Sequence, residues 1–353
     1  MPSSPVSLDA GFTEGLHGTE MAFQKGSIVS EEPFAVNLEP GNAETKLNFA
    51  TKKFRDAASG VALTATLAGE GSRLAIIHPG WLGDGEHPLS KYQVTELAKR
   101  LPDTQFAYVN APGVRGSDKL PGRVMREMER SGSYIPYGEI LNGVLEKLIK
   151  DSDTTDGVGW STGARALIGM LGAKEESQVF GNLVAIDGPG SRDLGGVLGI
   201  KDAFIVNEGA KAKQYNEANA DPETIRLKQA GGILGAVKLF GGMALRGALL
   251  QEVIGLPKVM AKSGLQGDLI EATDHLGAGQ KLAMVFSSPE LSALNDPQAI
   301  KKIMQLVSSQ TDAELTQMVL ERQSHGFMDA HTPYMTQLIA DILKLRHSDQ
   351  EAA

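Results

Sequence analysis

The 353-residue sequence has no cysteine, few aromatic residues and no cluster of basic residues. Without cysteine the chain has no disulfide, no thiolate nucleophile and no cysteine-ligated zinc site. Acidic residues outnumber basic ones by 43 to 34, which gives a net charge of −9. Because surfaces that bind nucleic acid are basic, we expect no nucleic-acid partner.

Long apolar segments are also missing. The most apolar stretch, AGGILGAVKLFGGMALRGALLQEVIGL, carries Lys238, Arg246 and Glu252 inside the length that would have to cross a bilayer. We therefore expect amphipathic helices there and no membrane span. The first residues, MPSSPVSLDAGFTEG, lack the basic and apolar regions of a secretory signal. Together with the absence of cysteine, this favours a cytoplasmic protein.

Strand and helix patterns alternate along most of the chain. Runs such as VALTATLAG, LAIIHPG and KLAMVFSS predict strands, because they are short, apolar and rich in β-branched residues. Between such runs, segments such as LSKYQVTELAKRL and GEILNGVLEKLIKD have apolar residues at helical spacing. This alternation predicts an α/β fold, with a doubly wound, mostly parallel sheet covered by helices on both faces.

The alternation stops between residues 191 and 279, where helical patterns rich in glycine and leucine follow one another. The chain is therefore predicted to contain a polar N-terminal leader (1–30), an α/β core in two segments (31–190 and 280–346), a helical cap insertion (191–279) and a short tail (347–353).

The segment DGVGWSTGARAL contains Ser161 with Gly159 two residues before it and Gly163 two residues after it. Glycine is frequent in this chain, so the spacing alone decides little. The context adds weight, because a short buried strand precedes Ser161 and a helical pattern follows it from Thr162. Such a strand-turn-helix places a serine on a sharp turn above a helix N-terminus, as a nucleophile requires.

The order of these features resembles the α/β-hydrolase fold. LAIIHPGWLGD resembles its oxyanion loop, NAPGVRGSD the loop after the next strand and GWSTG its nucleophile elbow, and the resemblance extends from about Val61 to Arg346. The insertion falls where that family carries its cap domain, and the last strand, histidine and helix fall where it has its catalytic histidine. The resemblance implies a Ser-His-acid triad with Ser161 as the nucleophile and no metal or organic cofactor.

The resemblance also implies where the oxyanion is bound. One donor is the backbone N–H of the residue after the nucleophile, Thr162, and the other comes from the loop HPGW. Because a proline is inserted relative to the commoner His-Gly pair, Trp81 is the expected donor, with Gly80 or Leu82 as alternatives. His78 is expected to make a hydrogen bond within the loop.

The base is sought among seven histidines. His17 lies in the predicted leader, His87 in the charged loop DGEHP and His347 in the tail. The family's order of serine, acid and histidine leaves His325 and His331, both in SHGFMDAHTPY. His325 has the family's spacing between the last apolar run and the final helix, whereas His331 directly precedes a predicted helix start. We favour His325 and keep His331 as the alternative.

Three carboxylates are candidates for the acid that orients the histidine. Glu290 stands at about the family's distance from the end of KLAMVFSS and ranks first. Asp296 ranks second, because its position before Pro297 already fits a helix N-cap. Asp187, at the end of LVAIDGPG, ranks third, because some lipases that resemble this family take their acid from that strand.

The predicted function is hydrolysis of an ester or related acyl bond of a small-molecule substrate through an acyl-enzyme. The apolar residues of the insertion favour an apolar substrate. Two alternatives stay open. The same triad also fits a cofactor-free haloperoxidase or an acyltransferase, and the fold also fits a non-catalytic binding protein. The sequence does not indicate an oligomeric state.

Overall fold

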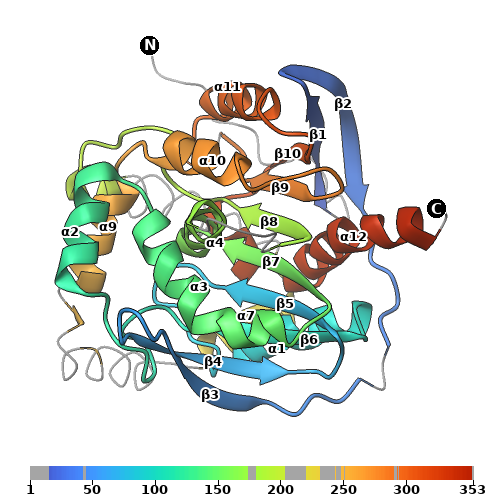
Figure 1. The fold of residues 1–353 in the computed structure, drawn as a ribbon. Coiled ribbons are helices and arrows are strands. Elements are labelled where there is room, and N and C mark those ends of the chain that lie inside the picture. Colours follow the sequence, from blue (N-terminus) through green and yellow to red (C-terminus); the bar gives the residue numbers. More distant parts are fainter. Residues whose placement is uncertain are drawn as a thin grey trace.

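A computed structural model gives the fold of the chain (Figure 1). The residues that it describes are 16–42, 45–173, 180–202, 220–230, 243, 248, 249, 251–289, 292 and 294–351. Glu290, the first-ranked acid, lies outside them.

The strands of the described residues form one ten-stranded sheet. They are β1 (Leu16–Gln24), β2 (Ser27–Val36), β3 (Ala50–Arg55), β4 (Ala62–Ala68), β5 (Arg73–His78), β6 (Thr104–Val109), β7 (Thr154–Trp160), β8 (Asn182–Ile186), β9 (Lys281–Phe286) and β10 (Glu314–Leu320).

The helices lie mostly between strands that are neighbours in the sequence. They are α1 (Pro88–Arg100), α2 (Gly122–Ser131), α3 (Ile135–Lys150), α4 (Thr162–Gly172), α5 (Val197–Lys201), α7 (Pro222–Gln229), the π-helix η2 (Gln251–Gly255), α9 (Leu256–Met260), α10 (Leu265–Thr273), α11 (Pro297–Ser308), the 3-10 helix η3 (His325–Asp329) and α12 (Thr332–Glu351).

The order of strands across the sheet is β2-β1-β10-β9-β8-β7-β5-β6-β4-β3. The six central strands, from β10 to β6, are parallel, and the two strands at each edge are antiparallel to their neighbours. In Figure 1, β3 lies at the bottom of the sheet and β2 at the upper right. The carboxyl ends of the parallel strands share one edge, where open α/β sheets bind their ligands.

Apolar side chains bury both faces of the sheet, as a doubly wound arrangement requires. One core lies between the sheet and the helices α2, α3, α4, α10 and α11. The other lies between the sheet and the helices α1 and α12, which contact each other. The predicted fold class is therefore confirmed.

Glycines in β7 explain how α4 comes close to the middle of the sheet. A methyl group on Gly159 would lie 2.6 Å from the Cα of Ala164, so only glycine permits this packing. The neighbouring side chains of Val158 and Trp160 belong to the opposite core. Along β7, Gly159 therefore faces α4 and Trp160 faces the opposite core.

The N-terminal leader predicted for residues 1–30 is wrong over its described part. Residues 16–36 form the hairpin of β1 and β2, and β1 pairs antiparallel with β10, with Gly18 opposite Leu320. The buried residues of β1 include Leu16, Met21 and Phe23, and exposed or half-buried polar residues lie between them. The polar composition of the segment conceals the two-residue spacing of buried side chains that indicates a strand.

Three further boundaries differ from the prediction. α12 continues to Glu351, so the predicted tail begins inside a helix. β3 and α2 lie in segments where neither was predicted. Within the predicted insertion, α10 contacts α4 and buries Leu265 and Leu269 in the main core, so this helix belongs to the core. The assignment of the remaining described helices to a separate cap stays a prediction.

No helix within the described ranges is both long enough and apolar enough to cross a membrane.

Candidate active site

Ser161 lies on a strained turn between β7 and α4. Its backbone has φ 54° and ψ −121°, a conformation that residues other than glycine rarely adopt. Its N–H donates to the carbonyl of Ile186 at 2.7 Å. A methyl group on Gly163 would lie 2.0 Å from the carbonyl oxygen of His78, so glycine is required next to the turn. The sequence thus holds the serine hydroxyl at the carboxyl edge of the sheet.

His325 lies beside this hydroxyl. It begins η3, five residues after β10 ends, and its side chain is buried. Its Nε2 lies 3.0 Å from Oγ of Ser161, and its Nδ1 lies 2.7 Å from Oδ2 of Asp187. Because a carboxylate only accepts hydrogen bonds, the Nδ1–H donates to Asp187 and leaves Nε2 free to accept the serine proton.

Asp187 is fully buried at the end of β8, where its own backbone is left-handed with φ 49°. Its carboxylate also accepts hydrogen bonds from the Ser287 hydroxyl at 2.8 Å and from the Asn295 amide at 2.9 Å. Burial alone would raise the pKa of Asp187. The charge of His325 and the hydrogen bonds from His325, Ser287 and Asn295 outweigh burial and hold this pKa below its ordinary value.

The structure therefore changes the ranking of the acid candidates. The third-ranked residue, Asp187, contacts His325. Asp296 caps the N-terminus of α11, where its side chain accepts hydrogen bonds from the N–H groups of Gln298 and Ala299. The loop after β9, which was expected to supply the acid, instead supplies the donor Ser287.

The loop that follows β5 is held by His78, as predicted. The Nδ1 of His78 donates to the carbonyl of Pro79 at 3.0 Å, and its Nε2 accepts from the hydroxyl of Tyr137 at 2.7 Å. Burial lowers the pKa of His78 to about 4, so the ring stays neutral near pH 7. The neutral ring with a fixed tautomer ties this loop to α3.

The loop then passes close to Ser161. A methyl group on Gly80 would lie 3.2 Å from Cβ of Ser161. The N–H of Gly83 donates to the carbonyl of Gly80 at 3.0 Å, which closes a turn with Leu82 at φ 62°. Trp81 occupies this turn with its side chain 39% exposed. Gly80 thus lies next to Ser161, while the residue that follows it, Trp81, is exposed.

The backbone N–H of Thr162 is at the first position of α4. An N–H at this position has no acceptor within its own helix. The helix dipole adds a partial positive charge at the same place. An oxygen that gains negative charge beside Ser161 would be stabilised there.

A second tryptophan, Trp160, contacts the imidazole of His325. Its ring stacks on that of His325, with centroids 5.9 Å apart and an angle of 28° between the planes. A methyl group on Gly80 would lie 3.3 Å from the same indole. Sequence reasoning missed this contact, as well as those of Ser287, Asn295 and Tyr137, because each joins segments far apart in the chain.

Of the histidine side chains that the structure describes, only His325 is found hydrogen-bonded to Ser161. His17 lies in β1, and His87 caps α1 by accepting a hydrogen bond from the N–H of Leu89 at 3.2 Å. His331, the alternative base, is buried just before α12, and burial lowers its pKa. His347 lies in α12.

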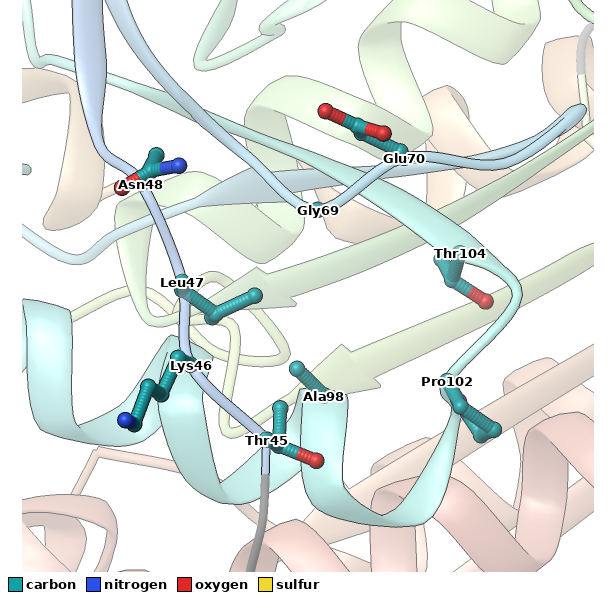
Figure 2. Close-up of a pocket in the computed structure, with 9 residues that line it drawn as sticks. All are labelled: Thr45, Lys46, Leu47, Asn48, Gly69, Glu70, Ala98, Pro102 and Thr104. Carbon is teal, nitrogen blue, oxygen red and sulfur yellow. The ribbon is translucent and has the colours of Figure 1, made fainter.

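A cavity of about 370 Å³ lies elsewhere in the molecule, and Figure 2 shows residues that line it. It lies between the segment 45–48, the turn at Gly69 and the start of β6 at Thr104. Thr104 begins a parallel strand, so this cavity is at the amino edge of the sheet, opposite Ser161. It therefore does not belong to the candidate site. Across the described ranges, no group of three His, Asp or Glu side chains is arranged to hold a metal ion.

No protein-family model and no curated protein matches the chain. Solved structures do match it. Epoxide hydrolase A from Mycobacterium thermoresistibile has a TM-score of 0.53 and 12% identity, covering 84% of this chain and 99% of its own. The bromoperoxidase from Bacillus anthracis has a TM-score of 0.52 and 13% identity, covering 84% and 100%. A haloalkane dehalogenase loop variant, DbeA-M1 from Bradyrhizobium elkanii, has a TM-score of 0.51 and 13% identity, covering 87% and 100%.

Proposed function

We propose that this chain, which has the α/β-hydrolase fold, is a serine hydrolase that cleaves an ester or related acyl bond. One observation carries the proposal, the continuous hydrogen-bonded series of Ser161, His325 and Asp187 at the carboxyl edge of the sheet. Similarity at these identities indicates the fold alone, and the reactions named for the similar structures differ from one another. The assignment of chemistry therefore rests on the side chains.

The proposed reaction begins at the serine hydroxyl. Oγ of Ser161 attacks the substrate carbonyl carbon while its proton moves to Nε2 of His325. The imidazolium is stabilised through Nδ1–H by Asp187, whose lowered pKa keeps it ionised. When the tetrahedral intermediate collapses, the proton passes from Nε2 to the leaving oxygen and an acyl-serine remains. Water repeats the sequence, with His325 as base, and releases the acid.

The carbonyl oxygen becomes an oxyanion during each attack. The N–H of Thr162 and an N–H of the loop 80–82 are the proposed donors, with Trp81 as the first choice in that loop. Both segments lie next to Ser161. Removing one donor of this kind typically costs about 100- to 1,000-fold in kcat.

The proposed substrate is a small molecule with an apolar acyl or alkyl group. This part of the proposal comes from the many apolar residues between 191 and 279, and from Trp81, an exposed aromatic residue in the loop that passes close to Ser161. A cytoplasmic location stays a prediction from composition.

A fluorophosphonate probe tests the nucleophile directly, since it labels only an activated serine. We expect stoichiometric labelling of Ser161 in the folded protein, and none in Ser161→Ala. The same substitution is expected to lower kcat for p-nitrophenyl esters by about four orders of magnitude or more. A series of acyl chain lengths then reports the preferred substrate size.

Ser90→Ala is the matched control. Ser90 is also buried, but its hydroxyl donates to Tyr108 and it takes no part in the triad. It should be labelled and turn over substrate like the wild type. If the wild-type protein is not labelled and Ser161→Ala has the same esterase activity as wild type, the chain is not a serine hydrolase. A non-catalytic binding role would then be favoured.

A further inference from the structure

We propose that Trp160 is a positioning residue for His325, whose indole face holds the imidazole toward Ser161 and stabilises the imidazolium. The inference rests on the proposed function for its catalytic consequence. The contact itself does not depend on that function, because it is a stacking of two rings that neither the motif nor the fold class requires.

The placement of Trp160 follows from β7. As the last residue of this strand, it immediately precedes the strained turn at Ser161. Its side chain packs against the core shared with α1 and α12, where Val158 also lies. Because β7 is at the centre of the sheet, the position of the Trp160 indole next to the site is fixed. Movement of β7 that displaced Trp160 would also displace the nucleophile.

Two groups hold the imidazole of His325 at its edges, and Trp160 covers its face. Asp187 binds Nδ1 and Ser161 binds Nε2. Two hydrogen bonds along one axis leave the ring free to tilt about that axis. A ring 5.9 Å away and at an angle of 28° opposes this tilt, and a cation within about 6 Å of an indole is attracted to its face.

Two carboxylates interact with His325 through their charge. Asp187 follows β8, and Asp329 lies four residues further along η3. The Asp329 carboxylate faces Gln93 of α1 at 3.5 Å and Lys228 of α7 at 3.8 Å. Neither carboxylate belongs to the side chain of Trp160, so replacing Trp160 leaves both charges in place. A change in the protonation of His325 in such a variant is then due to loss of the indole.

The indole Nε1 is buried without a hydrogen-bond partner among the described residues. Buried tryptophans usually satisfy this N–H. Trp160 is therefore held by contacts of its ring, which is the part of the side chain that the proposal uses.

The test compares Trp160→Leu with Trp160→Phe. Leucine keeps an apolar side chain but has no ring face, so the midpoint of the acid limb of kcat/KM should move down by about 0.5 to 1 pH unit. We expect kcat to fall about 5- to 30-fold, with KM within about 2-fold of wild type. Phenylalanine keeps a ring face and should retain most of both properties.

Phe106→Leu is the matched control. Phe106 is fully buried in the same core but on β6. It should lower the melting temperature about as much as Trp160→Leu does, without moving the pH midpoint. This separates loss of packing from loss of the stacked ring.

A second measurement needs no turnover. The chain has two tryptophans, so in Trp81→Phe the fluorescence comes from Trp160 alone. An imidazolium in contact with an indole quenches its emission, so we expect quenching as the pH falls, and no such step when His325→Gln is added. This titration works whether or not the protein hydrolyses esters.

The outcomes are distinguishable. If Trp160→Leu and Trp160→Phe share one pH midpoint with the wild type, and the fluorescence step persists in His325→Gln, Trp160 has only a packing role. If Ser161 is not labelled but the fluorescence step depends on His325, the stacking stands and the proposed hydrolase activity fails.

Discussion

Asp187 reaches His325 from the end of β8, in a left-handed backbone conformation. The sequence offered three carboxylates, each shortly after a strand, and the family's usual spacing favoured Glu290. What selects Asp187 is the pairing of β8 with β9, which brings Ser287 to within 2.8 Å of the same carboxylate. A donor directly after the neighbouring strand thus comes from the loop that was expected to supply the acid.

Asp187→Asn should lower kcat by about 10⁴, because an amide no longer stabilises the imidazolium and favours the wrong tautomer. Asp296→Asn should leave kcat within about 2-fold and stability nearly unchanged, because asparagine caps a helix as well as aspartate does. Steady-state kinetics on one ester compare the two. A loss of activity in Glu290→Gln, with Asp187→Asn fully active, would restore the first-ranked acid.

His78 makes stability depend on pH. In the unfolded chain its pKa is near 6.5, while burial lowers it to about 4 in the folded protein. Between these values the unfolded state binds more protons, so the free energy of unfolding falls as the pH falls from about 6.5 to 4. The expected loss is about 3 kcal/mol.

Urea unfolding at pH 7 and at pH 4 measures this loss. His78→Gln keeps an acceptor for Tyr137 but does not titrate, so its stability should fall less than that of the wild type over the same interval. Equal losses in both proteins would show that His78 is accessible to protons in the folded state.

At the scale of single residues, sequence reasoning selected the two side chains that are in contact here, Ser161 and His325. It could do so because strand ends, glycine spacing and the order of elements are local signals. The acid and the indole of Trp160 depend on which strands are neighbours and which face a side chain takes. Those facts are set by the register of the sheet, which no local pattern gives.

Among the elements, α4 is tied to its surroundings by a fully buried arginine. Arg165, one helical turn after Ser161, donates to the carboxylate of Asp268 in α10 at 2.5 Å. It also donates to the carbonyls of Pro189 at 2.6 Å and Gly132 at 3.0 Å. Pro189 is two residues after Asp187, so one guanidinium links the nucleophile helix to the loop of the acid.

Arg165→Met should cost about 3 to 5 kcal/mol in stability, because it leaves Asp268 as an uncompensated buried charge. Asp268→Asn should cost less, since the carbonyls of Pro189 and Gly132 still accept from Arg165. The double variant should lose less than the sum of the two single losses. Urea unfolding gives the three values.

Measurements of kcat distinguish the role of Arg165 from that of Asp268. Arg165→Met should also lower kcat, since the loop that carries Asp187 loses a donor, whereas Asp268→Asn should not. Strictly additive losses of stability would mean that the two side chains do not interact. The helical pattern predicted α4, but it gave no reason to expect an arginine inside the core.

At the scale of the whole molecule, the hairpin of β1 and β2 extends the sheet beyond β10 (Figure 1). The alternation of strand and helix patterns along the sequence was enough to predict the parallel core, because most central strands are short apolar runs. The hairpin was missed because only one of its faces is buried, and a polar outer face hides the period of two.

Gly18→Ala tests how closely the hairpin must approach β10. The added methyl group would lie 2.4 Å from the carbonyl oxygen of Val319 and 2.6 Å from the ring of Phe34. We expect a loss of about 1 to 3 kcal/mol in stability and faster hydrogen exchange at the amides of β10.

Gly267→Ala is the control for this substitution. A methyl group on Gly267, in α10, would meet nothing within 4 Å, so alanine should stabilise the protein by about 0.5 to 1 kcal/mol. Similar effects of the two substitutions would mean that β1 is not packed against β10.

The pairing of Gly18 with Leu320 also constrains the order of folding. β1 emerges from the ribosome well before its partner strand, because residue 18 pairs with residue 320. Until then β1 and β2 form at most a two-stranded hairpin, which is marginally stable alone. Closing so long a loop is slow. The edge of the sheet beside His325 is therefore completed only once β10 has been made, and the proposed base, which follows β10, is brought to Ser161 in the same late step.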